Sequence, residues 1–141
     1  MTAPHDDPIG PAGWDVLIVD DEPVVRGAIH RVLAAEGFSV AEADDARCGL
    51  AHPAAVTCRL LICDLMLPDQ PGIEVIHTLR ELRPDRPVIT ITGYTTPENV
   101  RRAREAGGVA FLPKPFDAPE LLAAVRRALS IVTVPPEEIR K

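Results

Sequence analysis

Aspartate residues follow two short apolar segments of the chain. Asp20 and Asp21 come directly after residues 16–19, and Asp64 comes directly after residues 60–63. Carboxylates held close together repel one another unless a cation offsets their charge, and a hard divalent ion with oxygen ligands suits them. Mg2+ fits better than Ca2+, because it is typically bound by one or two carboxylates and keeps coordination positions for phosphate oxygens. The three aspartates therefore predict a magnesium site.

Two further side chains follow later apolar segments and supply the remaining parts of a phosphoryl-transfer site. Thr92 offers a hydroxyl that can donate to an oxyanion. Lys114 lies between two prolines in a chain that uses arginine for nearly all its other basic residues, and its compact ammonium suits a point contact to phosphate. Asp64 stands alone and is the better nucleophile, whereas the adjacent Asp20 and Asp21 are better placed to hold the metal. Together these side chains predict transfer of a phosphoryl group onto Asp64.

These residues meet only if the segments before them are parallel strands of one sheet. Short runs rich in Val, Ile and Leu are typical of buried parallel strands, and we predict five, at residues 16–19, 38–43, 59–64, 88–92 and 109–113. Helical patterns follow them, beginning near residues 23, 45, 75, 96 and 117. Strict alternation predicts an α/β fold with a doubly wound five-stranded parallel sheet and helices on both faces. Such sheets bind ligands at the carboxyl edge of the strands.

Length and composition limit the remaining possibilities. The chain of 141 residues has the length of one domain, and we expect it at residues 14–132, between a flexible tail at 1–13 and a tail or linker at 133–141. The net charge of -6 and the pI of about 5.1 argue against general binding of nucleic acid or anionic membranes. The chain has three cysteines, an odd number, and none has the paired spacing of a zinc site. A disulfide framework is therefore not expected. The absence of a long apolar run leads us to expect a cytoplasmic protein.

Four motifs occur in order at the predicted strand ends, at residues 17–22, at 63–68 with Gly72, at 91–93 and at 111–116. With these motifs, residues 14–132 resemble the receiver domain of bacterial two-component response regulators. The resemblance implies a flavodoxin-like fold of the receiver type. It also implies a phosphoacceptor signalling domain rather than an enzyme, with at most weak self-dephosphorylation.

The resemblance implies a role for each residue of the acidic cluster. Asp64 would take a phosphoryl group from the phosphohistidine of a sensor histidine kinase or a histidine phosphotransfer protein. Mg2+ would be held by Asp21, Asp64 and the backbone carbonyl of Met66. Asp20 would orient the metal and its waters.

The resemblance also implies a switch and a face that reports its state. The hydroxyl of Thr92 would swing toward the phosphoryl group while the ring of Phe111 turns inward, a local charge event that biases a two-state element. The readout face would consist of the fourth predicted helix, the fifth strand and the fifth helix. It would bind a downstream protein or a second copy of the chain. The arginines of that face would pair with a partner or simply lie on a solvated surface.

Two residues beside the predicted site bear on how long a phosphoryl group would last. Met66 lies two residues after Asp64, and Tyr94 lies two residues after Thr92. Neither side chain is a carboxylate or carboxamide that can orient a hydrolytic water. We therefore expect slow loss of phosphate in the absence of a helper phosphatase.

Other functions use some of the same residues. A metal-dependent phosphatase with an aspartyl nucleophile needs a nucleophile and an acid two residues apart, which residues 20–22 do not provide, and an enclosing cap for the substrate. A receiver-like scaffold that only docks would not need phosphorylation. Direct DNA binding by this chain is not expected, because the nine residues after Val132 cannot form a helix-turn-helix. The prolines at 135 and 136 would suit a linker to an output domain of a longer protein.

Overall fold

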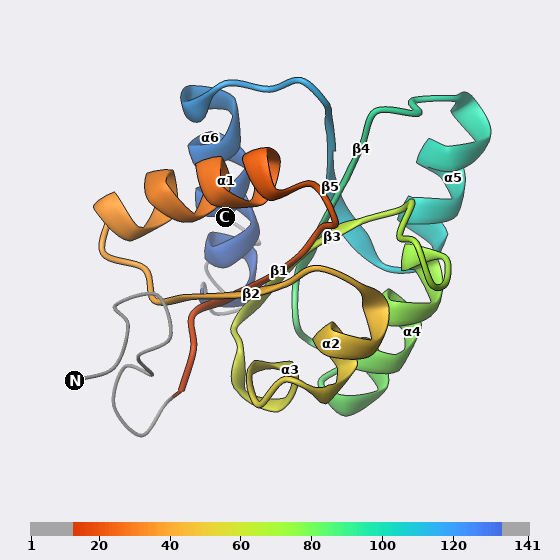
Figure 1. Ribbon diagram of the computed structural model, residues 1–141. Helices are drawn as coiled ribbons and strands as arrows, with labels where there is room; N and C mark the ends of the chain where they lie inside the picture. Colours follow the sequence, from red (N-terminus) through yellow and green to blue (C-terminus); the bar gives the residue numbers. More distant parts are fainter. Residues whose placement is uncertain (1–12, 134–141) are drawn as a thin grey trace, which may run out of the picture.

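The computed structural model describes residues 13–133 and places five parallel strands in one sheet (Figure 1). The strands are β1 (Val16–Val19), β2 (Val40–Ala43), β3 (Leu60–Asp64), β4 (Val88–Thr92) and β5 (Gly108–Pro113). Their spatial order is β2-β1-β3-β4-β5, so the direction of winding reverses between β1 and β3. This confirms the predicted doubly wound sheet. The crevice where such folds bind ligands lies at the ends of the two strands that precede the aspartates.

Helices cover both faces of the sheet, as Figure 1 shows. One face carries α1 (Pro23–Ala35) and α6 (Ala118–Thr133). The other carries α2 (Ala46–Ala51), α3 (Ala54–Thr57), α4 (Gly72–Leu82) and α5 (Pro97–Glu105). Side chains of each strand alternate between the two layers, since successive residues point to opposite faces.

Strand β1 illustrates why the sheet is stable with helices on both sides. Leu17 and Val19 pack into the layer beneath α2 and α4, whereas Val16 and Ile18 pack beneath α1 and α6. All four side chains are fully buried. A strand that is apolar on both faces can only be a central strand of a sheet covered on both sides.

The register of the strands aligns the predicted site residues along one edge. Val19 of β1 lies opposite Cys63 of β3, so Asp20 and Asp64 follow at neighbouring strand ends. On the other side of β3, Asp64 lies opposite Ile91 of β4. Thr92 is the last residue of β4 and lies opposite Pro113, the residue before Lys114.

The predicted starts of two helices, near 96 and 117, agree with the caps of the structure. The hydroxyl oxygen of Thr96 accepts a hydrogen bond of 3.1 Å from the backbone N–H of Asn99 at the start of α5. At α6 the Asp117 carboxylate accepts from the N–H of Glu120 at 2.8 Å, and the Glu120 carboxylate accepts from the N–H of Asp117 at 2.9 Å. This is the reciprocal capping box that the sequence indicates.

Several elements differ from the prediction, among them β3, which begins at Leu60 rather than 59, and α4, which begins at Gly72 rather than near 75. Strand β2 begins at Val40 rather than 38, because the hydroxyl of Ser39 accepts from the N–H of Asp15, and the carboxylate of Asp15 accepts from the N–H of Ser39. Strand β5 begins at Gly108, one residue earlier than predicted. The single-turn helix α3 was not predicted at all. It breaks the simple alternation of strand and helix.

Long-range contacts explain α3. The buried side chain of Arg86, 1% exposed, donates to the carbonyl oxygens of Ala55 at 2.7 Å and Val56 at 3.1 Å. These carbonyls belong to the last turn of a helix and need a donor from elsewhere. Because Arg86 is 31 residues away along the sequence from Ala55, local sequence patterns do not indicate this turn.

Other expectations concern the chain as a whole. Among residues 13–133 no helix is long and apolar enough to span a membrane. Cys48, Cys58 and Cys63 are free thiols, as their number and spacing indicate. Apart from Gly13 and Thr133, the predicted tails at 1–13 and 133–141 lie outside the described residues.

Candidate functional site

The side chain of Lys114 is the centre of the site. Its Nζ atom lies 2.7 Å from Oδ2 of Asp64, 3.0 Å from Oδ2 of Asp20 and 2.5 Å from Oε1 of Glu22. Burial alone lowers the pKa of a lysine, but the hydrogen bonds to these carboxylates outweigh it and raise the pKa of Lys114. The ammonium therefore stays charged and offsets part of the negative charge at the sheet edge.

Asp20 is a carboxylate that the protein alone does not fully satisfy. The residue is completely buried, and its Oδ1 atom accepts a hydrogen bond of 2.8 Å from the N–H of Glu22. Its Oδ2 atom is near Lys114 but has no aligned hydrogen bond. Burial raises the pKa of Asp20 in spite of the hydrogen bonds that oppose it. A buried acid with an oxygen free of hydrogen bonds fits a position beside a cation.

Asp64 is held from two sides. Its Oδ1 atom accepts from the N–H of Met66 at 2.9 Å, and its Oδ2 atom accepts from Lys114. The residue is 4% exposed at the floor of an open cavity. The predicted motif residue Gly72 lies directly against it, since a Cβ atom at Gly72 would fall 2.0 Å from the Asp64 carbonyl oxygen. Only glycine permits this approach of the loop after β3.

The three aspartates meet as the sequence predicts. One carboxylate oxygen from each of Asp20, Asp21 and Asp64 lies within 4.8 Å of the others. Asp21 is exposed, whereas the other two are buried. This cluster of hard oxygen donors fits a divalent cation. Met66 donates its N–H to Asp64, and its carbonyl as a further ligand stays a prediction.

Thr92 completes the polar part of the site. The residue is fully buried, and its hydroxyl oxygen accepts a hydrogen bond of 3.0 Å from the N–H of Tyr94. Its carbonyl oxygen accepts from the N–H of Lys114 at 2.8 Å, which ties the ends of β4 and β5 together. In this arrangement the hydroxyl hydrogen of Thr92 is available to an incoming oxygen atom.

These residues border a cavity of about 850 Å3 at the carboxyl edge of the sheet. Its polar wall consists of Asp21, Glu22, Asp64, Thr92 and Lys114. Its remaining walls are mainly apolar and come from α1 and from the loops after β3, β4 and β5. They comprise Val24, Val25, Ala28, Met66, Gly93, Tyr94, Pro115 and Phe116. Charged groups on one wall and apolar groups on the others are typical of a cavity that binds a small ligand.

Phe111 lies apart from this group. Its half-buried ring packs against the core layer beneath α4 and α5 and borders a separate cavity of about 100 Å3 with Thr90, Ala103 and Val109. The structure thus brings together Asp20, Asp21, Asp64, Thr92 and Lys114 and places Phe111 on the α5 side of β5. Its predicted role in a switch stays a prediction.

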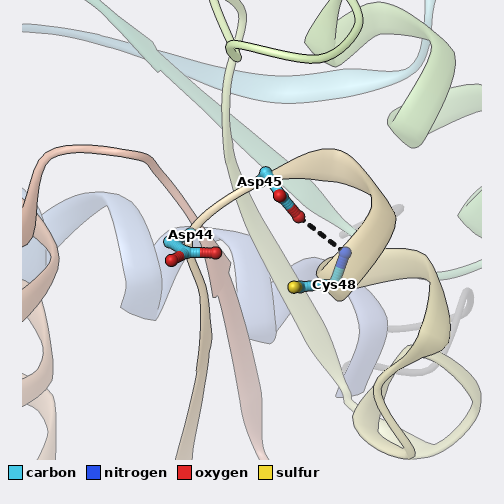
Figure 2. Close-up of side chains that lie close together, drawn as sticks. All are labelled: Asp44, Asp45 and Cys48. Carbon is cyan, nitrogen blue, oxygen red and sulfur yellow. Dashed lines mark hydrogen bonds between the residues drawn. The ribbon is translucent and has the colours of Figure 1, made fainter.

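A second acidic cluster lies at the end of β2, where Asp44, Asp45 and Cys48 face one another (Figure 2). The Asp45 carboxylate caps α2 by accepting from the N–H of Cys48 at 2.7 Å. The nearby carboxylates, Asp45 above all, raise the pKa of the Cys48 thiol. A protonated thiol is a poor metal ligand and nucleophile, so we interpret this cluster as a helix cap.

Glu22 is a site residue to which sequence reasoning assigned no role. It contacts Lys114, and its N–H donates to Asp20. Its position directly after Asp20 and Asp21 is the sequence feature that could have indicated its place in the site. Arg26 contacts the backbone of the loop after β1, Glu42 pairs with Arg26, and Asp69 of the loop after β3 accepts from α2. No sequence motif marks these three residues.

Comparison with known proteins connects this fold and site to a family. The family model described as the response regulator receiver domain matches residues 16–126. The chain is 36% identical over 115 residues to the transcriptional regulatory protein FixJ of Rhizobium meliloti, covering 82% of this chain and 56% of FixJ. It is also 36% identical over 117 residues to the nitrogen assimilation regulatory protein NtrX of Azorhizobium caulinodans, covering 82% of this chain and 26% of NtrX.

Solved structures agree with this relationship. The crystal structure of a CheY-like response regulator receiver domain protein from Methanospirillum hungatei matches with a TM-score of 0.79 and 31% identity, covering 85% of this chain and 96% of that one. The parallel sheet with its acidic carboxyl edge defines a signalling domain of the flavodoxin-like class. The chain belongs to the response regulator receiver domain family and is a receiver domain of two-component signalling. It spans about a quarter of NtrX and about half of FixJ.

Proposed function

We propose that the chain accepts a phosphoryl group on Asp64 from the phosphohistidine of a sensor histidine kinase or a histidine phosphotransfer protein, in a reaction that depends on Mg2+. The observation that carries this proposal is the position of Asp64, which lies at the floor of an open cavity with one carboxylate oxygen on the ammonium of Lys114. A nucleophile and a fixed cation at one point are the parts that phosphoryl transfer needs.

The acidic cluster supports a magnesium site. Asp20, Asp21, Asp64 and the Met66 carbonyl would hold the ion, and three carboxylates around one ammonium leave negative charge for a further cation to offset. Bound there, Mg2+ supplies positive charge to the oxygens of the phosphoryl group. The ammonium of Lys114, which pairs with Asp20 and Asp64, supplies positive charge in addition to that of the ion.

Asp64, Lys114 and Thr92 would each have a role in the phosphoryl transfer. A carboxylate oxygen of Asp64 attacks phosphorus, a phosphorus–oxygen bond forms, and the phosphorus–nitrogen bond to the donor histidine breaks with its electron pair returning to the imidazole. Lys114 stabilises charge on one phosphoryl oxygen, and the Thr92 hydroxyl donates to another. The apolar rim of the cavity, with Val24 and Phe116, shields the new acyl phosphate from part of the solvent.

Phosphorylation would then act on a switch. When the Thr92 hydroxyl turns toward the phosphoryl group, it gives up its contact with the N–H of Tyr94. The Phe111 ring, which borders a small cavity beside α5, would move inward in response. The face made by α5, β5 and α6, which are the fourth helix, fifth strand and fifth helix of the sequence prediction, would bind a downstream protein or a second copy of the chain.

The place of the domain in the cell follows from the same proposal. A receiver domain phosphorylated by a sensor histidine kinase would work in the cytoplasm and act as a switch rather than as an enzyme. FixJ and NtrX are named as regulatory proteins and are longer than this chain. With its net charge of -6, we expect the chain to act through protein contacts rather than through direct contact with DNA.

Incubation of the purified chain with acetyl phosphate tests the proposal, with and without MgCl2. We expect a stable phosphoprotein that forms only with MgCl2, and negligible turnover of a generic phosphate ester. Rapid turnover of the ester with no accumulated phosphoprotein would indicate a phosphatase instead. No labelling under any condition would indicate a scaffold that works by docking alone, and would contradict the proposal.

A further inference from the structure

The β2–α2 segment, residues 40–51, contributes no residue to the cluster of Asp20, Asp21 and Asp64. Side-chain hydrogen bonds nevertheless connect it to the loop after β1 and to the loop after β3. The first connection runs from β2 to the loop after β1. The guanidinium group of Arg26, in α1, donates from one terminal nitrogen to the Asp20 carbonyl oxygen at 2.7 Å and from Nε to the Glu42 carboxylate at 2.8 Å. Glu42 lies in β2, so a single arginine joins the edge strand to the acidic loop.

Burial makes this connection rigid. The side chains of Arg26, Glu42 and His30 are only 17%, 25% and 14% exposed. The second oxygen of Glu42 contacts Nδ1 of His30 at 2.5 Å, so the carboxylate is held from two positions on α1. The Asp20 carbonyl belongs to the peptide unit that precedes Asp21. Fixing that peptide plane fixes the position of the Cα atom of Asp21, which lies in the same plane.

The second connection runs from α2 to the loop after β3. The carboxylate of Asp69 accepts hydrogen bonds from the N–H groups of Ala46 at 3.0 Å and Arg47 at 2.9 Å, the first two residues of α2. These hydrogen bonds lower the pKa of Asp69, so the group is ionised at neutral pH. On the same loop, Met66 and Pro71 pair as an isolated antiparallel bridge. The loop that carries Met66 is therefore closed on itself and anchored to α2.

We propose that the β2–α2 segment is the anchor that positions the cation ligands, with Arg26 and Asp69 as positioning residues for the loops that carry Asp21 and Met66. This inference rests on the proposed Mg2+ site. Outer groups that fix the orientation of metal ligands commonly change metal affinity when they are removed. The two connections reach the site from opposite sides, through α1 and through the loop after β3.

The variant Arg26→Gln gives the sharpest test, because two explanations predict opposite results. If only charge matters, removing a positive charge near three aspartates strengthens Mg2+ binding. If Arg26 positions the loop, the same change weakens binding, by about tenfold. Affinity is measured by titrating the full chain with MgCl2 and following the backbone amide NMR signals of residues near the cluster. Circular dichroism and urea unfolding verify that each variant is folded.

Arg59→Gln serves as the matched control. Arg59 also pairs with a carboxylate, that of Asp15 at 3.3 Å, but the pair lies at the opposite end of β1 and β3. We expect its Mg2+ affinity to equal that of the native chain. Unchanged or tighter binding by Arg26→Gln would overturn the inference. If the native chain itself does not bind Mg2+, the proposed Mg2+ site is wrong. That result is distinct from unchanged binding by Arg26→Gln, which contradicts only the positioning role of Arg26. Should Arg26→Gln fail to fold, Arg26→Lys tests the same connection, because it keeps the positive charge but loses the guanidinium contact with both oxygens, and weaker Mg2+ binding is again expected.

The second anchor is tested by Asp69→Ala, with Asp44→Ala as its control. Both aspartates are exposed and lie near α2, but the N–H groups of Ala46 and Arg47 at the start of the helix donate to Asp69. Each variant removes one negative charge, so a difference between them reports the contact of Asp69 with the N–H groups. We expect Asp69→Ala to bind Mg2+ at least about threefold more weakly than Asp44→Ala. Equal affinities would contradict the role of Asp69.

Discussion

The Nζ atom of Lys114 lies 2.7 Å from Oδ2 of Asp64, although 50 residues separate them in the sequence. The same ammonium also contacts Asp20 and Glu22. The cluster therefore contains its own counter-charge before any metal ion binds. This makes Lys114 both a structural ion-pair partner and the cation best placed to meet a phosphoryl group on Asp64.

Replacing Lys114 tests how much its ion pairs contribute to the stability of the fold. The variant Lys114→Met leaves its carboxylates without their cation, and we expect it to be about 3 kcal/mol less stable than the native chain at neutral pH without Mg2+. Because contacts raise the folded pKa of Lys114 above its ordinary value of 10.5, their stabilisation is complete below that pH and is lost as the pH rises above it. The free energy of urea unfolding should therefore fall more steeply above about pH 10 in the native chain than in the variant. Equal slopes would contradict this role.

Replacing Asp20 should have the opposite effect on stability. Burial raises the folded pKa of Asp20, so the ionised group costs stability once the pH is above its folded pKa. We expect Asp20→Asn to be on the order of 1 kcal/mol more stable than the native chain at neutral pH without Mg2+. The difference should shrink as the pH falls toward the ordinary value of 3.8. Thermal unfolding measures this directly.

Mg2+ supplies the control for the Asp20 variant. MgCl2 should raise the unfolding temperature of the native chain, because a ligand that binds only the folded state stabilises it. The same salt should have little effect on Asp20→Asn. A variant that is less stable than the native chain without Mg2+ would show that Asp20 is a structural residue rather than a metal-site residue.

Most of the fold followed from the sequence because its signals are local. Apolar runs at 16–19 and 88–92 marked strands, and the capping residues Thr96 and Asp117 marked helix starts. The turn α3 did not follow, because its carbonyls depend on the distant Arg86.

The sequence also predicted which residues would lie close together in the candidate site, but not all of their contacts. Residues at strand ends could be placed together because parallel strands share one edge. Glu22 was missed as a partner of Lys114 because only the folded chain shows which of several adjacent acids reaches the ammonium. The contacts of Arg26 and Asp69 were missed for a related reason, since only the folded chain shows which polar groups of other elements these side chains reach.

Gly72 provides a test of the loop after β3. Its Cβ position lies 2.0 Å from the backbone oxygen of Asp64, which cannot move without displacing the end of the strand. We expect Gly72→Ala to lose about 3 kcal/mol of unfolding free energy in urea. Gly93→Ala is the matched control, because a Cβ there meets no atom within 4 Å, and it should change stability by less than about 0.5 kcal/mol. Comparable losses in the two variants would refute the steric explanation.

The lifetime of the phosphoryl group should depend on Met66 and Tyr94. Both side chains are more than half exposed at the rim of the cavity, at 53% and 63%, where a hydrolytic water would enter. Neither orients water, so the native phosphoprotein should be long-lived. We expect Met66→Asn to shorten its lifetime by about tenfold, since a carboxamide can position the water. Decay of the label is followed after removal of the donor, with Met66→Leu as a control of similar size. Equal lifetimes for the Asn and Leu variants would disprove this role.

The central claim is that Asp64 is the residue that receives the phosphoryl group. Intact mass spectrometry before and after treatment with acetyl phosphate and MgCl2 tests it most directly, with Asp64→Asn as the comparison. The variant removes one carboxylate but retains Asp20, Asp21 and Lys114. We predict that the native chain gains the mass of one phosphoryl group and that Asp64→Asn gains none. An equal mass gain in both proteins would contradict the account.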